Sequence, residues 1–156
     1  MSSVSLIVFS GEYDRAMSAL TIANGAAGEG DKVSVFFTFW GLNLLRRRRQ
    51  PGGNGLQQAF KRLMPLGPDG LPISHFNFLG LGPFLLRRLI RSQNGQTLQD
   101  LLDMAVERGV DLVACEASLK MLGLTRGELL PTERLRIGGI HDFLAAAREA
   151  ELCLFI

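Results

Sequence analysis

The two cysteines of this chain are its strongest nucleophiles, and their sequence contexts differ. Cys115 ends a short apolar run, residues 111–115, and begins a helix-like segment, whereas Cys153 lies inside an apolar run near the C-terminus. A thiol at a helix start can ionise at neutral pH, because backbone N–H groups there stabilise negative charge. The alternative is that Cys115 fills the core, as most free cysteines do, and Glu116 beside it opposes a thiolate. Cys153 is expected to be a core residue.

Metal chemistry is not indicated. The cysteines form no CxxC pair, and His75 and His141 have no acidic or cysteine partner at ligand spacing. No Ser/His/Asp set with a G-x-S-x-G elbow is present. We therefore expect no metal site and no cofactor. Two distant, unpaired thiols also favour a reducing compartment, and we expect a cytoplasmic protein.

Along the chain, continuous apolar runs alternate with segments in which apolar residues recur at helical spacing. Strands are predicted at residues 4–9, 33–39, 111–115, 135–137 and 152–156. Helices are predicted from about 13 to 28, between Thr97 and Gly109, from 116 to 122 with Gly123 as the cap, and around 140–147. This order predicts an α/β fold: a single doubly wound domain, residues 1–156, with a mostly parallel five-stranded sheet.

In such a fold, chemistry is expected at the carboxyl ends of the strands. The first strand leads into Ser10, Gly11, Glu12 and Tyr13; the second into Trp40 and Asn43; and the third into Cys115, Glu116 and Ser118. We expect these residues to form one rim, catalytic or lining a small-ligand pocket. Loop formation and helix capping explain the first group equally well. That group has no glycine-rich phosphate-binding motif, and its acids would repel phosphate.

Residues 44–95 form a basic helical and loop insert in an otherwise acidic domain. They carry nine Lys or Arg and one acid, Asp69, whereas the rest of the chain has eight basic and fourteen acidic residues. Helices are expected at residues 56–63 and 83–91. Arg46, Arg47, Arg48 and Arg49 are interpreted as a solvated face or as a docking surface for an acidic protein. No nucleic-acid-binding signature is present, so we expect no nucleic-acid partner.

No apolar run is long enough to span a membrane. The longest candidate, residues 76–86, has 11 residues and contains Asn, Gly and Pro. The N-terminus lacks the basic region of a secretory signal. Association with a membrane surface through residues 76–91 is a weaker alternative.

Three stretches together resemble a known family: SGEYDRAMSALTIANGAAGEGDKVSVFFTFWGLNLLRR (residues 10–47), KRLMPLGPDGLPISHFNFLGLG (61–82) and ACEASLKMLGL (114–124). They are similar to the DsrE/DsrF-like sulfur-transfer family, in its larger branch with a basic insert. The resemblance implies a compact doubly wound α/β domain that assembles into trimers or hexamers. It also implies that Cys115 carries sulfane sulfur, with Ser118, Met121 and Gly123 matching the family pattern. Ala117 differs, because relatives in this branch often have Met there.

Two hypotheses about function follow. In the first, Cys115 holds sulfane sulfur as a persulfide and relays it to a small sulfur-carrier protein, which makes the chain a sulfurtransferase acting through one cysteine. The basic insert would dock the acidic donor or acceptor protein. In the second, the chain is a non-catalytic, oligomeric binding or assembly module of the same fold, with a small-ligand pocket at the carboxyl ends of the strands.

Overall fold

A parallel sheet forms the centre of the molecule. The computed structural model describes residues 2–156, and within them the strand order is β4-β3-β2-β1-β5, with every neighbouring pair parallel. The strands are β1 (Ser3–Val8), β2 (Lys32–Phe37), β3 (Asp111–Cys115), β4 (Leu135–Gly138) and β5 (Leu152–Phe155). The expected α/β fold with a five-stranded sheet is confirmed, and each strand begins and ends within two residues of its prediction.

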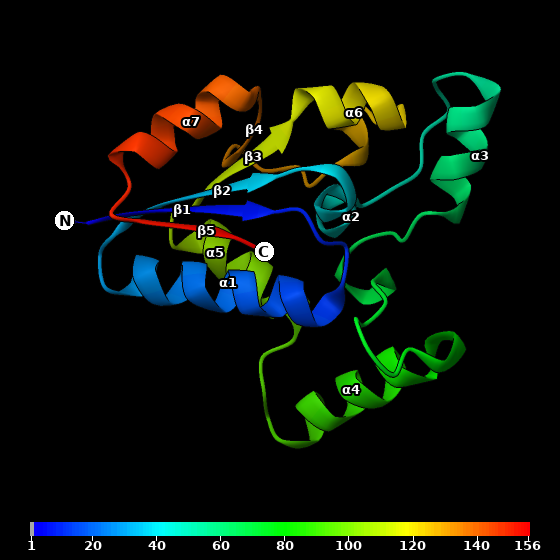
Figure 1. Ribbon diagram of the computed structural model, residues 1–156. Coiled ribbons are helices and arrows are strands. Elements are labelled where there is room, and N and C mark those ends of the chain that lie inside the picture. The colour runs from blue at the N-terminus through cyan, green and yellow to red at the C-terminus, as the bar shows by residue number, and fades with distance from the viewer. Residues whose placement is uncertain (1) are drawn as a thin grey trace.

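Helices cover the two faces of the sheet unequally (Figure 1). Helices α1 (Tyr13–Gly28) and α5 (Leu98–Glu107) lie side by side on one face and enclose the large core. Helix α7 (Ile140–Glu149) lies on the other face, and none of its residues is buried. Phe143 of α7 packs partly against Phe36, Val113 and Cys115, which form a second, small apolar cluster. The face that carries Cys115 is therefore thinly covered.

The amphipathic pattern and the caps explain where the helices begin and end. Ala16, Ala19 and Leu20 of α1 point into the core at helical spacing. At the start of α5, the Asp100 backbone N–H donates to Thr97 Oγ1 at 3.2 Å, and the Thr97 N–H donates to the Asp100 carboxylate at 2.8 Å. This is a capping box, with Asp in the last position.

The basic segment, residues 44–95, contains the two helices expected within it. Short helix α2 (Leu42–Leu45) precedes α3 (Gly55–Leu63), and α4 (Leu81–Ser92) follows two 3-10 turns, η2 (Pro68–Gly70) and η3 (Phe78–Gly80). Met64 and Leu71 are buried in the main core, and Leu86 of α4 packs against it. The segment is thus anchored to the domain at several points. Among residues 2–156, no helix combines the length and the apolar character that crossing a bilayer requires.

The arginine run is only partly at the surface, which corrects one expectation. Arg46 is fully buried, and its guanidinium lies 3.8 Å from Glu128, whose other oxygen is 2.9 Å from the Lys61 ammonium. Glu128 belongs to the 3-10 turn η4 (Arg126–Glu128). A charge is buried at lower cost when it is paired and hydrogen-bonded, so this cluster ties the basic segment to η4. Arg46 is therefore unavailable for docking a partner.

The other arginines of the run differ in exposure. Arg47 is half-buried and donates to the carbonyls of Leu44 and Arg46, at 3.2 and 3.1 Å. Arg48 and Arg49 are exposed. Any docking through this run rests on these two side chains.

Candidate functional site

Cys115 is the last residue of β3, and the chain enters helix α6 (Glu116–Leu122) directly after it. Its register partner on the neighbouring strand is Gly138 of β4. The side chain is 9% exposed and packs in the small cluster beneath α7. Helix α6 ends at Gly123, whose φ of +67° suits glycine. Cys115 thus lies at the strand-to-helix junction that the sequence predicts.

The surroundings of the thiol favour its ionised form. Burial raises the pKa of Cys115, but hydrogen bonds from the hydroxyl and backbone N–H of Ser118, the hydroxyl of Thr38 and the backbone N–H of Ala117 act in the opposite direction. The net effect places the pKa of Cys115 below the ordinary value of a thiol. The fraction of thiolate at neutral pH is raised accordingly.

Two hydroxyl groups hold this arrangement together. Thr38 Oγ1 and Ser118 Oγ are 2.9 Å apart, within hydrogen-bond distance of each other, and a hydroxyl that donates to the other cannot donate to the thiolate at the same time. Thr38 follows β2, the strand next to β3, so the end of one strand supports the thiol at the end of its neighbour. The sequence indicates Ser118 but not Thr38. A single polar residue within the apolar run of residues 35–40 was the available signal.

Glu116 and Tyr13 have roles outside the cysteine site. Glu116 is exposed and forms an ion pair with Lys120 at 2.7 Å, one turn further along α6. Tyr13 is buried, and its hydroxyl accepts a hydrogen bond from the backbone N–H of Leu98 at 3.2 Å. Tyr13 therefore joins the start of α1 to the start of α5 rather than facing a ligand.

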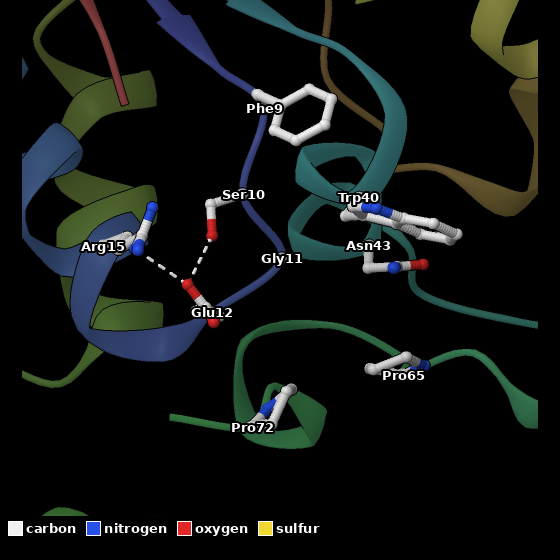
Figure 2. Close-up of a pocket in the computed structure, with 9 residues that line it drawn as sticks. All are labelled: Phe9, Ser10, Gly11, Glu12, Arg15, Trp40, Asn43, Pro65 and Pro72. Atoms are coloured by element: carbon white, nitrogen blue, oxygen red, sulfur yellow. Dashed lines mark hydrogen bonds and ion pairs between the residues drawn. The ribbon is translucent and has the colours of Figure 1, made fainter. Parts of the chain in front are cut away.

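The remaining rim candidates, Ser10, Gly11, Glu12, Trp40 and Asn43, line one cavity of about 400 Å³ (Figure 2). Sequence reasoning missed the other lining residues, which are Phe9, Arg15, Pro65 and Pro72. The two prolines come from the basic segment, which closes the cavity from the side opposite Ser10 and Gly11. Cys115 does not line this cavity. The single rim expected from the sequence is therefore two places, the cysteine site and the cavity.

A smaller apolar cleft of about 270 Å³ lies between α3 and α6. Trp40 and Phe60 form one wall, with ring centroids 6.2 Å apart. Met121 and Leu122 of α6 line the cleft as well, and so does Phe39, the residue after Thr38. Trp40 thus separates this cleft from the larger cavity, because it lines both.

Cys153 is exposed on edge strand β5, so the expectation that it fills the core is wrong. Its register partner is Ser5 of β1, which pairs with Ser34 of β2 and through it with Asp111 of β3. Cys153 and Cys115 therefore lie on the same face, three strands apart and four residues apart along the strand direction. Strand spacing and rise place them roughly 19 Å apart, whereas a disulfide brings Cα atoms within about 7 Å.

The positions of possible metal-ligating side chains were compared across the described residues. No group of three or more His, Cys, Asp or Glu side chains converges among residues 2–156.

Comparison with known proteins assigns the chain to a family. It is 42% identical over 153 residues to the uncharacterized protein YrkE of Bacillus subtilis (strain 168), covering 97% of this chain and 94% of that protein. It is 25% identical over 166 residues to the sulfur carrier protein DsrE2 of Allochromatium vinosum, covering 98% and 97%. The fold matches the crystal structure of the ychN protein from E. coli over the full length of both chains, with a TM-score of 0.59 and 11% identity. Residues 1–155 match the family model, and the chain belongs to the DsrE/DsrF/DrsH-like family.

Proposed function

We propose that this protein is a sulfur carrier that holds sulfane sulfur as a persulfide on Cys115 and relays it to a partner protein. The observation that carries the proposal is the donor set around the thiol, which lowers the pKa of Cys115 despite its burial. The relationship to a protein named as a sulfur carrier, across nearly the whole chain, supports the same role.

The transfer needs only thiol exchange chemistry. The Cys115 thiolate attacks the outer sulfur of a donor persulfide, a new S–S bond forms, and the donor leaves as a thiolate. In the second step an acceptor thiolate attacks the outer sulfur of the Cys115 persulfide, and Cys115 leaves as a thiolate. Each step breaks one S–S bond and forms another, so no external oxidant or reductant is consumed.

The acceptor thiol comes from another molecule in this scheme. Cys153 lies roughly 19 Å from Cys115 by strand spacing and rise, too far to attack its persulfide within one chain. Arg48 and Arg49 are exposed and supply positive charge for docking an acidic donor or acceptor protein. Assembly into trimers or hexamers stays a prediction of the family resemblance.

Intact-protein mass spectrometry tests the proposal. The reduced protein is incubated with thiosulfate or with a low-molecular-weight persulfide, desalted and weighed. We expect an added mass of about 32 Da, one sulfur atom, which dithiothreitol removes. Cys153→Ser is the matched control and should load as the wild type does, whereas Cys115→Ser should not load.

Persistence of the added sulfur in Cys115→Ser, or its loss in Cys153→Ser, contradicts the assignment to Cys115. Absence of loading in every variant would instead favour the second candidate, a binding module of the same fold. The cavity beside Trp40 is the observation that favours that candidate, because it has the size of a small-ligand site and does not include Cys115.

A further inference from the structure

A cavity lies at the ends of β1 and β2. It has a volume of about 400 Å³ and lies at the carboxyl ends of parallel strands, where α/β domains bind ligands. Figure 2 shows Ser10 and Glu12 on one side, Trp40 and Asn43 on another, and Pro65 and Pro72 closing the third. The persulfide transfer proposed for Cys115 does not involve this cavity.

The walls of the cavity are held in place by contacts that need no ligand. The backbone N–H of Tyr13 donates to the Pro72 carbonyl at 2.7 Å. The Asp14 carboxylate accepts hydrogen bonds from the Ser74 backbone N–H, at 2.9 Å, and from the Ser74 hydroxyl. A Cβ atom on Gly11 would lie 2.9 Å from Trp40, so glycine allows the two walls to approach. The site is therefore preformed.

The cavity presents one carboxylate and one guanidinium, each with free atoms. Glu12 Oε2 accepts from the Ser10 hydroxyl at 2.9 Å and pairs with Arg15 Nε at 2.8 Å. Within residues 2–156, Glu12 Oε1 and the two terminal nitrogens of Arg15 make no hydrogen bond. A ligand that carries both a cation and an anion would satisfy both groups, whereas a phosphate would be repelled by Glu12.

Asn43 adds an amide nitrogen donor to the wall of the cavity. Its side chain is 2% exposed and lines the cavity, yet its amide makes no hydrogen bond among the described residues, and Oδ1 is buried without a partner. Oδ1 is closed to solvent, so the amide atom that a ligand in the cavity can reach is the nitrogen, Nδ2. This nitrogen is a donor and suits a carboxylate.

We propose that this cavity binds an α-amino acid zwitterion. The ammonium group is held by Glu12, the carboxylate by Arg15 and Asn43, and an apolar side chain packs against Phe9 and Trp40. This inference rests on the cavity alone. It goes beyond the persulfide chemistry of Cys115 and does not depend on it.

Trp40 makes the proposal directly testable, because it is the only tryptophan of the chain and lines the cavity. L-methionine is titrated against the full chain, followed by tryptophan fluorescence and by calorimetry. N-acetyl-L-methionine lacks the ammonium, and L-methionine methyl ester lacks the carboxylate. We expect saturable binding of L-methionine and at least about tenfold weaker binding of each blocked analogue, since each loses one charged contact.

Variants assign the contacts. Glu12→Gln should reduce the preference for L-methionine over its N-acetyl analogue, and Arg15→Gln the preference over the methyl ester. Glu116→Gln removes a carboxylate remote from the cavity and should leave binding unchanged, and circular dichroism checks that each variant is folded. Because Trp40 also lines the apolar cleft, binding unaffected by Glu12→Gln and Arg15→Gln places the ligand elsewhere and overturns the proposal. The absence of heat and of a fluorescence change up to about 10 mM, or equal binding of all three compounds, overturns it as well.

Discussion

Cys115 and Cys153 lie on the same face of one sheet, yet their surroundings are opposite in the two properties that govern thiol chemistry. Cys115 is 9% exposed, beneath Phe143, and it receives hydrogen bonds from Ser118 and Thr38. Cys153 is exposed on the edge strand β5. Exposure and activation of a thiol are therefore supplied separately in this fold. Activation comes from the end of a strand, where the next helix and the neighbouring strand contribute donors.

A buried thiol with a lowered pKa suits a carrier better than an exposed one does. A persulfide is itself reactive. The cover formed by Phe36 and Phe143 shields it from bulky oxidants and from adventitious thiols, which would otherwise remove its outer sulfur. The thinly covered face above Cys115 nevertheless leaves only one helix, α7, between the thiol and a partner. We therefore expect selectivity by the size of the reacting molecule.

Selectivity by size should give the strongest contrast between the two cysteines. The single-cysteine variants Cys115→Ser and Cys153→Ser are each treated with the bulky reagent 5,5′-dithiobis(2-nitrobenzoic acid) and with the small reagent iodoacetamide. We divide the rate with the bulky reagent by the rate with iodoacetamide for each cysteine. This ratio should be at least about tenfold higher for Cys153 than for Cys115, because the aromatic cover over Cys115 excludes only the bulky reagent. Each rate is measured under denaturing conditions as the control. Equal ratios in the folded protein would show that Cys115 is as open as Cys153.

A second effect comes from the hydroxyl donors. Ser118→Ala removes a hydrogen bond to the thiolate, and a hydrogen bond to a charged group is worth about 1.5 kcal/mol, or roughly one pKa unit. The pKa of Cys115 should rise by that amount, so alkylation at pH 7 should slow by up to about tenfold. Thr38→Val should raise the pKa less, since the contribution of Thr38 is smaller.

The pH dependence of iodoacetamide alkylation, recorded in the Cys153→Ser background, measures these shifts. The lowered pKa of Cys115 means that its reactivity should rise with pH and level off below the pH at which an ordinary thiol does. Ser18→Ala is the matched control, because its hydroxyl bonds a carbonyl of α1 far from the thiol. An unchanged profile in Ser118→Ala would assign the activation to the backbone N–H groups and the Thr38 hydroxyl.

Local patterns predicted the strands and the position of Cys115, because apolar runs and helix stops are properties of neighbouring residues. The failures share a different cause. Arg46 was interpreted as a surface charge, but it is buried because Glu128, 82 positions away, pairs with it. Cys153 lies in an apolar run, as core residues do. Its strand, however, is at the edge of the sheet, where a neighbouring strand is present on one side only, and the side chain is exposed. The burial of Arg46 depends on long-range pairing and the exposure of Cys153 depends on strand order. A single sequence displays neither.

The candidate site divides in the same way. Ser118 was identified because it follows the third strand directly after Cys115 and matches the family pattern, whereas Thr38 is brought to the thiol by the pairing of β2 with β3. Gly11, Glu12 and Trp40 were assigned correctly to the ends of strands. The walls formed by Pro65 and Pro72 depend on how the basic segment folds back over those ends, which no local pattern reports.

The smallest expected effects come from the two side chains that follow Cys115 directly. Glu116 carries a negative charge beside the thiol, but it is exposed and paired with Lys120 at 2.7 Å, so solvent and the partner screen it. Ala117 contributes through its backbone N–H, and its side chain is exposed. Glu116→Gln and Ala117→Met should each change the pKa of Cys115 by less than about 0.3 units.

The same alkylation profile decides this point, and Lys120→Gln sharpens it. Removing Lys120 leaves the Glu116 carboxylate unpaired, so a modest rise in the pKa of Cys115 should appear in that variant and disappear in the double variant with Glu116→Gln. A fall of more than about half a unit in Glu116→Gln alone would mean that the carboxylate is strongly coupled to the thiol. The distinction between the two cysteines would then rest on a charge balance along α6 as well as on the hydroxyl donors of Ser118 and Thr38.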